Sequence, residues 1–176
     1  MLAQEIIDRL ALQPLPVEGG YFGETYRAEE TLGVDALPDR YTSPRSLGTA
    51  IYYFLHSGHV SALHRLQTDE IYHFYLGQPV ELLLLYPDGS AETRRLGTDL
   101  TSGERPQIVV PRGVWQGLQL VKPELADGFA LLGTTMAPGF DPTDFELGSR
   151  SPLLASYPQF AAQILLLTPR EEGELP

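Results

Sequence analysis

Residues 58–77 of the chain read GHVSALHRLQTDEIYHFYLG, and this stretch decides the fold. It holds two short runs rich in β-branched and aromatic residues with a polar break between them, which is typical of two successive β-strands. Side chains alternate between the faces of a strand, so His64 shares a face with Leu66. If His64 and Glu70 both point inward, an imidazole and a carboxylate meet inside a β structure.

Similar short runs, punctuated by Gly and Pro, continue on both sides of this stretch. The expected strands lie at 21–28, 47–56, 60–66, 71–76, 80–86, 91–96, 107–110, 114–121 and 128–136. The sequence PDGS at 87–90 has the residues of a tight turn and predicts a hairpin between the runs that flank it. No strand–helix–strand alternation appears, so the pattern favours an all-β jelly roll or small barrel.

Two helices are expected at the ends of the chain. Leu2, Ile6, Ile7 and Leu10 recur at helical spacing before two prolines end the pattern. Near the C-terminus, residues 156–167 carry a helical apolar stripe.

The start of this second helix and one long connection have their own signals. Ser156 and Gln159 are spaced as a capping box, which predicts that the C-terminal helix begins there. The run 29–46 is rich in Pro, Asp, Gly and Ser and has no clear period. It predicts a long inserted loop, which is a candidate cover for an opening of the barrel.

The composition narrows the class of protein. At 176 residues, we expect one domain that spans residues 1–176. The formal charge of −11 gives net repulsion toward polyanions, so we expect neither nucleic acid nor an anionic membrane surface as a partner. No secretory signal is visible, which favours a cytoplasmic protein. The chain has no cysteine, so any metal must be bound by His, carboxylate or amide oxygen.

The opening stretch resembles the first motif of the cupin superfamily. That motif is a Gly, five residues, a His, one residue, a His, three or four residues, a Glu, six residues and a Gly. Gly58, His64, Glu70 and Gly77 fit this spacing, and Leu66 stands where the second His belongs.

A second stretch is similar to the other cupin motif, which ends in Pro, one residue, Gly, two residues and His. Pro111 and Gly113 match it, and Gln116 replaces the His. A cupin subgroup of unknown function shares further stretches at 18–27, 64–77, 107–116, 137–141 and 144–146. This resemblance implies a double-stranded β-helix, the cupin jelly roll, often as a homodimer and with no settled activity.

The resemblance implies that His64 and Glu70 form the site. A full cupin site offers three imidazoles and one carboxylate, a set well suited to divalent first-row metals. This chain retains one of each, with the neutral amide of Gln116 beside them. We therefore expect no cofactor, and a weakly held divalent metal on these three residues is the alternative.

Without a metal, a carboxylate beside an imidazole provides the pair that general acid–base catalysis needs. Some metal-free cupins isomerise or epimerise sugars in this way. The resemblance thus permits an isomerase or epimerase that acts on a small polar, sugar-like ligand through catalytic His64 and Glu70. A non-catalytic small-molecule-binding module and a purely structural His–Glu pair remain open alternatives.

Six further residues are expected to surround the ligand. They are Glu24, Tyr26, Leu66, Tyr72, Phe74 and Gln116. Glu24 and Tyr26 alternate along their strand, which predicts that Arg27 lies on the opposite face. The same alternation turns His73 away from the cavity. Trp115 is expected to look outward, toward a neighbouring sheet or a second subunit of a homodimer.

Overall fold

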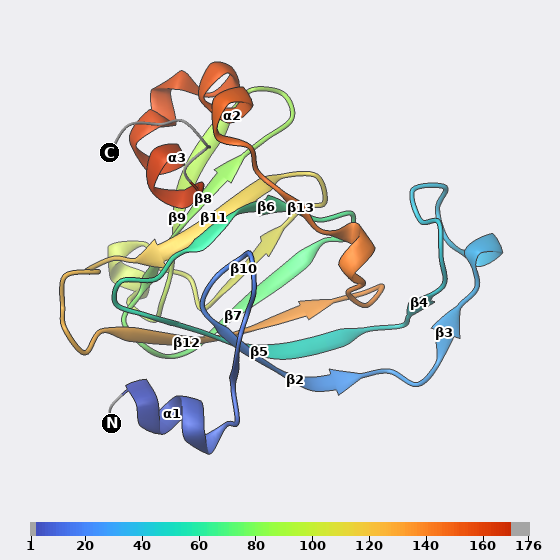
Figure 1. The fold of residues 1–176 in the computed structure, drawn as a ribbon, viewed down its shortest axis with the longest axis horizontal. Helices are drawn as coiled ribbons and strands as arrows, with labels where there is room; N and C mark the ends of the chain where they lie inside the picture. The colour runs from blue at the N-terminus through green and yellow to red at the C-terminus, as the bar shows by residue number, and fades with distance from the viewer. Residues whose placement is uncertain (1–2, 170–176) are drawn as a thin grey trace.

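The fold is built from two β-sheets that face each other, as seen in a computed structural model that describes residues 3–169 (Figure 1). The strands are β1 (Gln13–Pro14), β2 (Tyr21–Arg27), β3 (Thr31–Leu32), β4 (Arg45–Ser46), β5 (Thr49–His56), β6 (Ser61–Arg65), β7 (Glu70–Gly77), β8 (Val80–Leu85), β9 (Ala91–Leu96), β10 (Gln107–Val110), β11 (Trp115–Leu120), β12 (Phe129–Met136) and β13 (Glu146–Leu147). The α-helices are α1 (Ala3–Arg9), α2 (Arg150–Ser156) and α3 (Ala161–Leu167). Short 3-10 turns are η1 (Val34–Ala36), η2 (Leu100–Ser102), η3 (Pro142–Asp144) and η4 (Pro158–Phe160).

The strand order is that of a jelly roll, which confirms the predicted all-β class. One sheet has six strands in the order β1-β2-β5-β12-β7-β10, and the other has five in the order β13-β6-β11-β8-β9. Each of the nine predicted runs forms one of the long strands, β2 and β5 to β12. The predicted hairpin is present, with Leu85 opposite Ala91, and Gly89 adopts φ +86 in its turn.

Strand β8 shows how alternation builds two layers of core. Its sequence VELLLL is apolar on both faces. Leu82 and Leu84 pack between the two sheets, whereas Leu83 and Leu85 pack outward beneath the C-terminal helices. Figure 1 shows α2 and α3 over this sheet, so both faces of β8 are covered and neither exposes leucine to water.

Helix α1 covers the outer face of the six-stranded sheet. Ile6 and Ile7 are buried there against Phe54 and Leu131, as the helical spacing predicts. Leu2, part of the predicted stripe, lies outside the described residues. No helix within residues 3–169 is long and apolar enough to cross a lipid bilayer.

The predicted start of the C-terminal helix is wrong. Ser156 ends α2 instead of capping a new helix, and Tyr157 leaves the helical conformation with φ −132 and ψ 57. Pro158 follows, and the residue before a proline is disfavoured in the α region. The predicted stripe nevertheless packs, because Ile164 and Leu167 of α3 are buried.

Trp115 is covered by its own chain. It packs with Phe160 and Val60 against the cluster beneath the C-terminal helices, and the guanidinium of Arg65 lies 4.5 Å from its ring centroid. An outward Trp115 therefore gives no support to the predicted homodimer, which remains a prediction from the resemblance.

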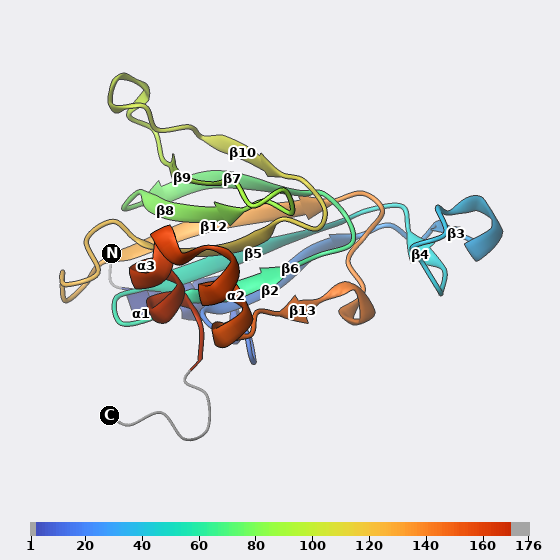
Figure 2. The ribbon, with the colours of Figure 1, turned by 90° about the horizontal axis from the view of Figure 1, so that it is seen from above.

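The segment 29–46 is inserted between β2 and β5, as predicted, and forms an arm. Strands β3 and β4 pair in it, and the arm projects beyond the end of the sheets (Figure 2). At its base Arg45 forms an ion pair with Asp144, with Nη2 and Oδ1 2.6 Å apart and side chains only 2% and 0% exposed. This pair joins the arm to the segment that follows β12.

Replacing one partner of this ion pair should destabilise the fold strongly. Asp144→Asn leaves the Arg45 guanidinium buried without its counter-charge, so we expect a loss of about 3 kcal/mol or more in the free energy of unfolding. Urea denaturation of both proteins measures this difference.

The matched control lies two residues away on the same segment. Glu146 forms an exposed ion pair with Arg65, with the carboxylate 2.8 Å from Nε. Glu146→Gln should cost less than about 1 kcal/mol, since exposed pairs contribute little. Equal losses in the two variants would contradict the role given to the buried pair.

Candidate functional site

His64 and Glu70 approach each other from opposite sheets. His64 is on β6 of the five-stranded sheet, and Glu70 begins β7 of the six-stranded sheet. The connection 66–69 carries the chain from one sheet to the other. The two residues are 2% and 6% exposed, so both are withdrawn from bulk water.

Gln116 joins the two residues. It lies opposite His64 in the β11–β6 pairing, and its Nε2 is 2.7 Å from Oε2 of Glu70 and 3.3 Å from Nε2 of His64. Nδ1 of His64 is 2.8 Å from the carbonyl oxygen of Ala62, which can only accept, so Nδ1 carries the proton. Nε2 of His64 then has a free lone pair, and the Gln116 amide donates one N–H to it and one to Glu70.

The amide orientation leaves one atom unsatisfied. Oε1 of Gln116 is buried and has no hydrogen-bond partner among the described residues. Turning the amide over would place this oxygen 2.7 Å from the Glu70 carboxylate, where two acceptors repel. A purely structural pair would be expected to satisfy its buried polar groups, so the unpaired oxygen favours a functional site.

Burial controls the charge of Glu70. Removal from water raises the pKa of this carboxyl group above its usual value, while the electrostatic interaction with His64 and hydrogen bonds from Thr134 and Gln116 act in the opposite direction. Burial and the nearby charge of Glu70 raise the pKa of the Tyr72 hydroxyl well above its usual value. Glu70 is thus a carboxylate that folding makes easier to protonate.

A cavity of about 250 Å³ opens beside this group. Its apolar lining residues are Leu15, Phe22, Ile51, Leu66, Met136, Phe140, Pro142 and Phe145. Its polar lining residues are Glu18, Glu24, Arg27, Thr49, His64, Glu70 and Thr134. The volume suits a small organic molecule, with polar groups placed on a mainly apolar wall.

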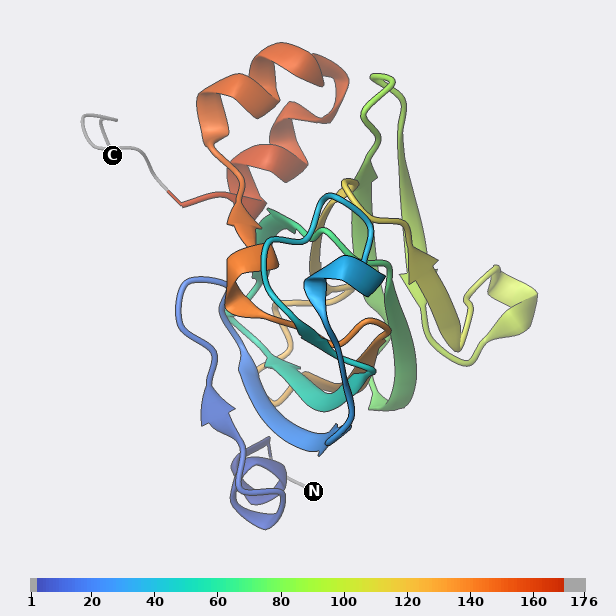
Figure 3. The ribbon, with the colours of Figure 1, turned by 90° about the vertical axis from the view of Figure 1, so that its right-hand side faces the viewer.

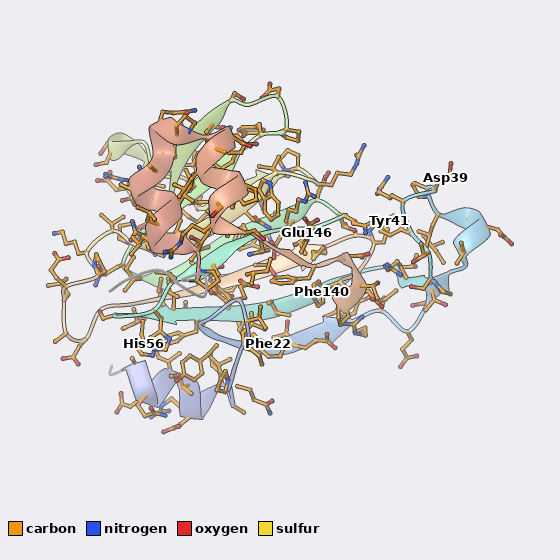
Figure 4. The ribbon with its side chains drawn as sticks, turned by 45° about the horizontal axis from the view of Figure 1, so that its top comes forward. Phe22, Asp39, Tyr41, His56, Phe140 and Glu146 are labelled. Carbon is orange, nitrogen blue, oxygen red and sulfur yellow. The ribbon has the colours of Figure 1, made fainter. Side chains whose placement is uncertain are left out.

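The cavity lies toward the arm's end of the molecule. Figure 4 shows Phe140 on the side of Tyr41 and the arm, with His56 at the opposite end. Figure 3 views the two sheets from the arm's end, with the arm in front. No residue of the segment 29–46 lines the cavity, so this segment does not form the cover expected from the sequence.

The predicted ligand-binding residues divide into two groups. Glu24 and Leu66 line the cavity, and Gln116 lies directly behind it, 1% exposed. Tyr72 and Phe74 do not line it, because each step along β7 carries their shared face deeper into the core between the sheets.

Tyr26 and Arg27 lie on the opposite faces of β2 from those predicted. Glu24 pairs with Ile51 and Tyr26 pairs with Ala50, so Thr25 is an extra residue in a β-bulge. The bulge shifts the alternation by one place. Arg27 therefore lines the cavity, where its Nη2 is 2.7 Å from the Glu24 carboxylate, and Tyr26 is 57% exposed outside it.

The segment after β12 supplies lining residues to which the sequence assigned no role. Phe140, Pro142 and Phe145 close one side of the cavity, and the Phe145 ring stacks on His64 with centroids 5.1 Å apart. The resemblance had marked this stretch without indicating its use. A Pro- and Gly-rich segment with two aromatic residues just beyond the last long strand was the available signal.

The donor atoms do not fit a tight metal site. Glu70 and His64 direct their acceptors at the amide nitrogen of Gln116, and Leu66 supplies only hydrocarbon. Within residues 3–169 no three His, Asp, Glu or Cys side chains are grouped to hold a metal ion. His73 faces away, 3.0 Å from Oγ1 of Thr135.

Comparison with known proteins places this fold and site in a family. The family described as "Cupin superfamily (DUF985)" matches residues 4–148. An uncharacterised protein of Saccharomyces cerevisiae, YML079W, is 32% identical over 129 residues. That match covers 70% of this chain but 64% of the yeast protein, so the chain spans less than two thirds of that relative.

Solved structures agree over almost the whole chain. Protein SO0799 from Shewanella oneidensis is 38% identical with a TM-score of 0.83, covering 97% of this chain and 99% of that one. A hypothetical protein from Leishmania major is 29% identical with a TM-score of 0.84, covering 97% and 100%. With its two modified motifs, its jelly roll and these relatives, the chain belongs to the cupin superfamily.

Proposed function

We propose that the chain binds a small uncharged organic molecule in the cavity and moves a proton on it without a metal, as an isomerase or epimerase. The observation that carries this proposal is the buried carboxylate of Glu70, held by Gln116 at a mainly apolar cavity. A base withdrawn from water with a raised pKa is suited to take a proton from carbon or oxygen and return it.

His64 supplies the second titratable group of the proposed reaction. Among residues 3–169 its Nε2 has one polar contact, 3.3 Å from Gln116 and at the weak end of the hydrogen-bond range. A ligand hydroxyl can replace this contact and place a proton donor or acceptor at Nε2. Glu70 then takes the proton at one position of the ligand while His64 exchanges one at another.

The charge of the cavity indicates the class of ligand. Arg27 compensates the charge of Glu24, whereas Glu18 has no cationic partner within residues 3–169 and accepts a 2.8 Å hydrogen bond from Ser61. Glu18 and Glu70 leave the cavity with a negative balance. An anion would be repelled there, and the mainly apolar wall suits an uncharged ligand, sugar-like or otherwise hydroxylated.

Two other functions are compatible with parts of this geometry. A non-catalytic binding module would need only the cavity and its mainly apolar wall. A metal-dependent enzyme would need His64, Glu70 and Gln116 to bind a cation, which the direction of the amide nitrogen disfavours. Proton transfer uses the raised pKa of Glu70, and neither alternative does.

Glu70→Gln should stabilise the chain near pH 7 and have little stabilising effect near pH 4. The folded-state pKa of Glu70 is raised, so the folded chain keeps this proton over a range where the unfolded chain has released it. Stability therefore falls as the pH rises through that range, and the variant lacks this loss. Urea denaturation at both pH values measures the effect.

Glu124→Gln is the control, because Glu124 is exposed and its removal should change stability little at either pH. If Glu70→Gln lowers stability near pH 7 as much as near pH 4, the pair is structural and the catalytic interpretation loses its main support.

Proton transfer can be detected without knowing the product. We expect a screen of neutral aldoses, ketoses and hydroxyketones to give ligands that raise the melting temperature, and NMR in deuterium oxide to show solvent deuterium entering the bound ligand at carbon. Glu70→Gln and His64→Ala should each reduce that incorporation by about a hundredfold or more. Arg9→Ala, on α1, is the control that should retain it.

Two results would redirect this interpretation. A ligand that binds Glu70→Gln and His64→Ala as tightly as the parent chain would show that the site is misassigned. A ligand that binds the parent chain and incorporates no deuterium would favour the binding module.

Restoring the missing imidazoles should create metal binding. Leu66→His together with Gln116→His places three imidazoles and one carboxylate around the same point, so we expect the double variant to bind Ni²⁺ or Mn²⁺ stoichiometrically by calorimetry. The same double change in a His64→Ala background should bind more weakly. Stoichiometric metal retained by the parent chain through a chelator wash would overturn the metal-free mechanism.

A further inference from the structure

A second hollow lies beside the cavity and has a different electrostatic character. It measures about 580 Å³ and shares Leu66 and Phe145 with the cavity as a common wall. Arg40, Arg65 and Arg112 line it, from the arm, from β6 and from the turn before β11. We refer to it as the arginine groove.

Two of the three arginines keep an uncompensated charge. Arg65 is neutralised by Glu146, with two hydrogen bonds of 2.8 and 2.9 Å. Asp144, the other acid that lines the groove, is already paired with the buried Arg45. Arg40 and Arg112 therefore give the groove a positive balance on a chain whose formal charge is −11.

Arg40 is held in place and keeps unused N–H donors on its guanidinium. Its Nε donates to the carbonyl oxygen of Gln67 at 2.9 Å, and its guanidinium lies 4.6 Å from the ring centroid of Tyr41. Nη2 has a longer contact of 3.3 Å with the Tyr41 hydroxyl. Nη1 makes no hydrogen bond within residues 3–169, so it can donate to a ligand.

The whole guanidinium of Arg112 is available to a ligand. Gly113, at φ +77, donates its N–H to the carbonyl oxygen of Leu66 at 2.9 Å, and the backbone N–H of Arg112 donates to Oδ1 of Asp69 at 2.8 Å. These bonds fix the turn, and the Asp69 carboxylate contacts the backbone of Arg112 and not its guanidinium. The Arg112 side chain itself has no hydrogen bond or ion pair with any residue that the structure describes.

We propose that the arginine groove is an oxyanion-binding site, in which Arg40 and Arg112 hold a phosphate or carboxylate group. A guanidinium presents a planar fork of N–H donors that matches the oxygens of these anions. The neighbouring cavity is negative and favours a neutral molecule, so the two hollows select for different chemistry. This site does not depend on the proton transfer proposed for His64 and Glu70.

Inorganic phosphate is the probe for this site. A titration of the ¹⁵N-labelled chain, with ionic strength held constant by sodium chloride, should shift the amide signals of Arg112, Gly113 and Gln67 in a saturable way. Arg112→Ala should raise the dissociation constant for phosphate about tenfold, since one charge-assisted contact is lost. Arg40→Ala should weaken it comparably, and acetate should shift the same signals with lower affinity.

Arg112→Lys and Arg9→Ala complete the set of variants. Lysine keeps the charge and loses the fork, so Arg112→Lys should bind between the parent chain and Arg112→Ala. Arg9 is exposed on α1, away from the groove, and Arg9→Ala should bind as the parent does. Arg112 is exposed and its side chain is unpaired, so its variants should fold as the parent does.

The proposal is overturned by either of two results. One is that chloride alone shifts these signals as much as phosphate does. The other is that Arg112→Ala and Arg40→Ala bind phosphate with the affinity of the parent chain while the amide spectra show that both variants are folded.

Discussion

The site depends on one amide group that spans the space between the two sheets. Gln116 donates to a carboxylate from one sheet and an imidazole from the other, and both acceptors are buried. This geometry requires the chain to leave β6 just after His64 and to enter β7 at Glu70, so the short connection 66–69 fixes the separation of the two groups. A buried oxygen without a partner and a buried carboxylate each oppose folding, and this arrangement contains both, Oε1 of Gln116 and Glu70.

Where alternation was the only information needed, the sequence predicted the structure well. Each long strand coincides with a predicted run, and β8, apolar at successive positions, is buried on both faces. The resemblance located His64 and Glu70, and the register of β6 and β11 brings Gln116 to the same point. These features are local or are fixed by motif spacing.

The site features that could not be predicted from the sequence depend on geometry that local sequence patterns do not indicate. One extra residue in β2 exchanges Tyr26 and Arg27, because a bulge reverses the alternation beyond it. Tyr72 lies on the predicted face of β7 but too deep along the barrel to meet a ligand. The aromatic residues after β12 lie on a segment that long-range contacts hold in place, among them the ion pair of Asp144 with Arg45, 99 residues apart in the chain.

That long-range tie also explains why two hollows of different charge can exist so close together. The segment held by Asp144 separates them, with Phe140 and Pro142 on the side of the cavity and Thr143 and Glu146 on the side of the arginine groove. Leu66 and Phe145 form the shared apolar wall, which keeps the Arg112 guanidinium out of the cavity that Glu70 lines. This separation favours the proposed role of Glu70, since a guanidinium placed beside its carboxylate would lower its pKa and make it a weaker base.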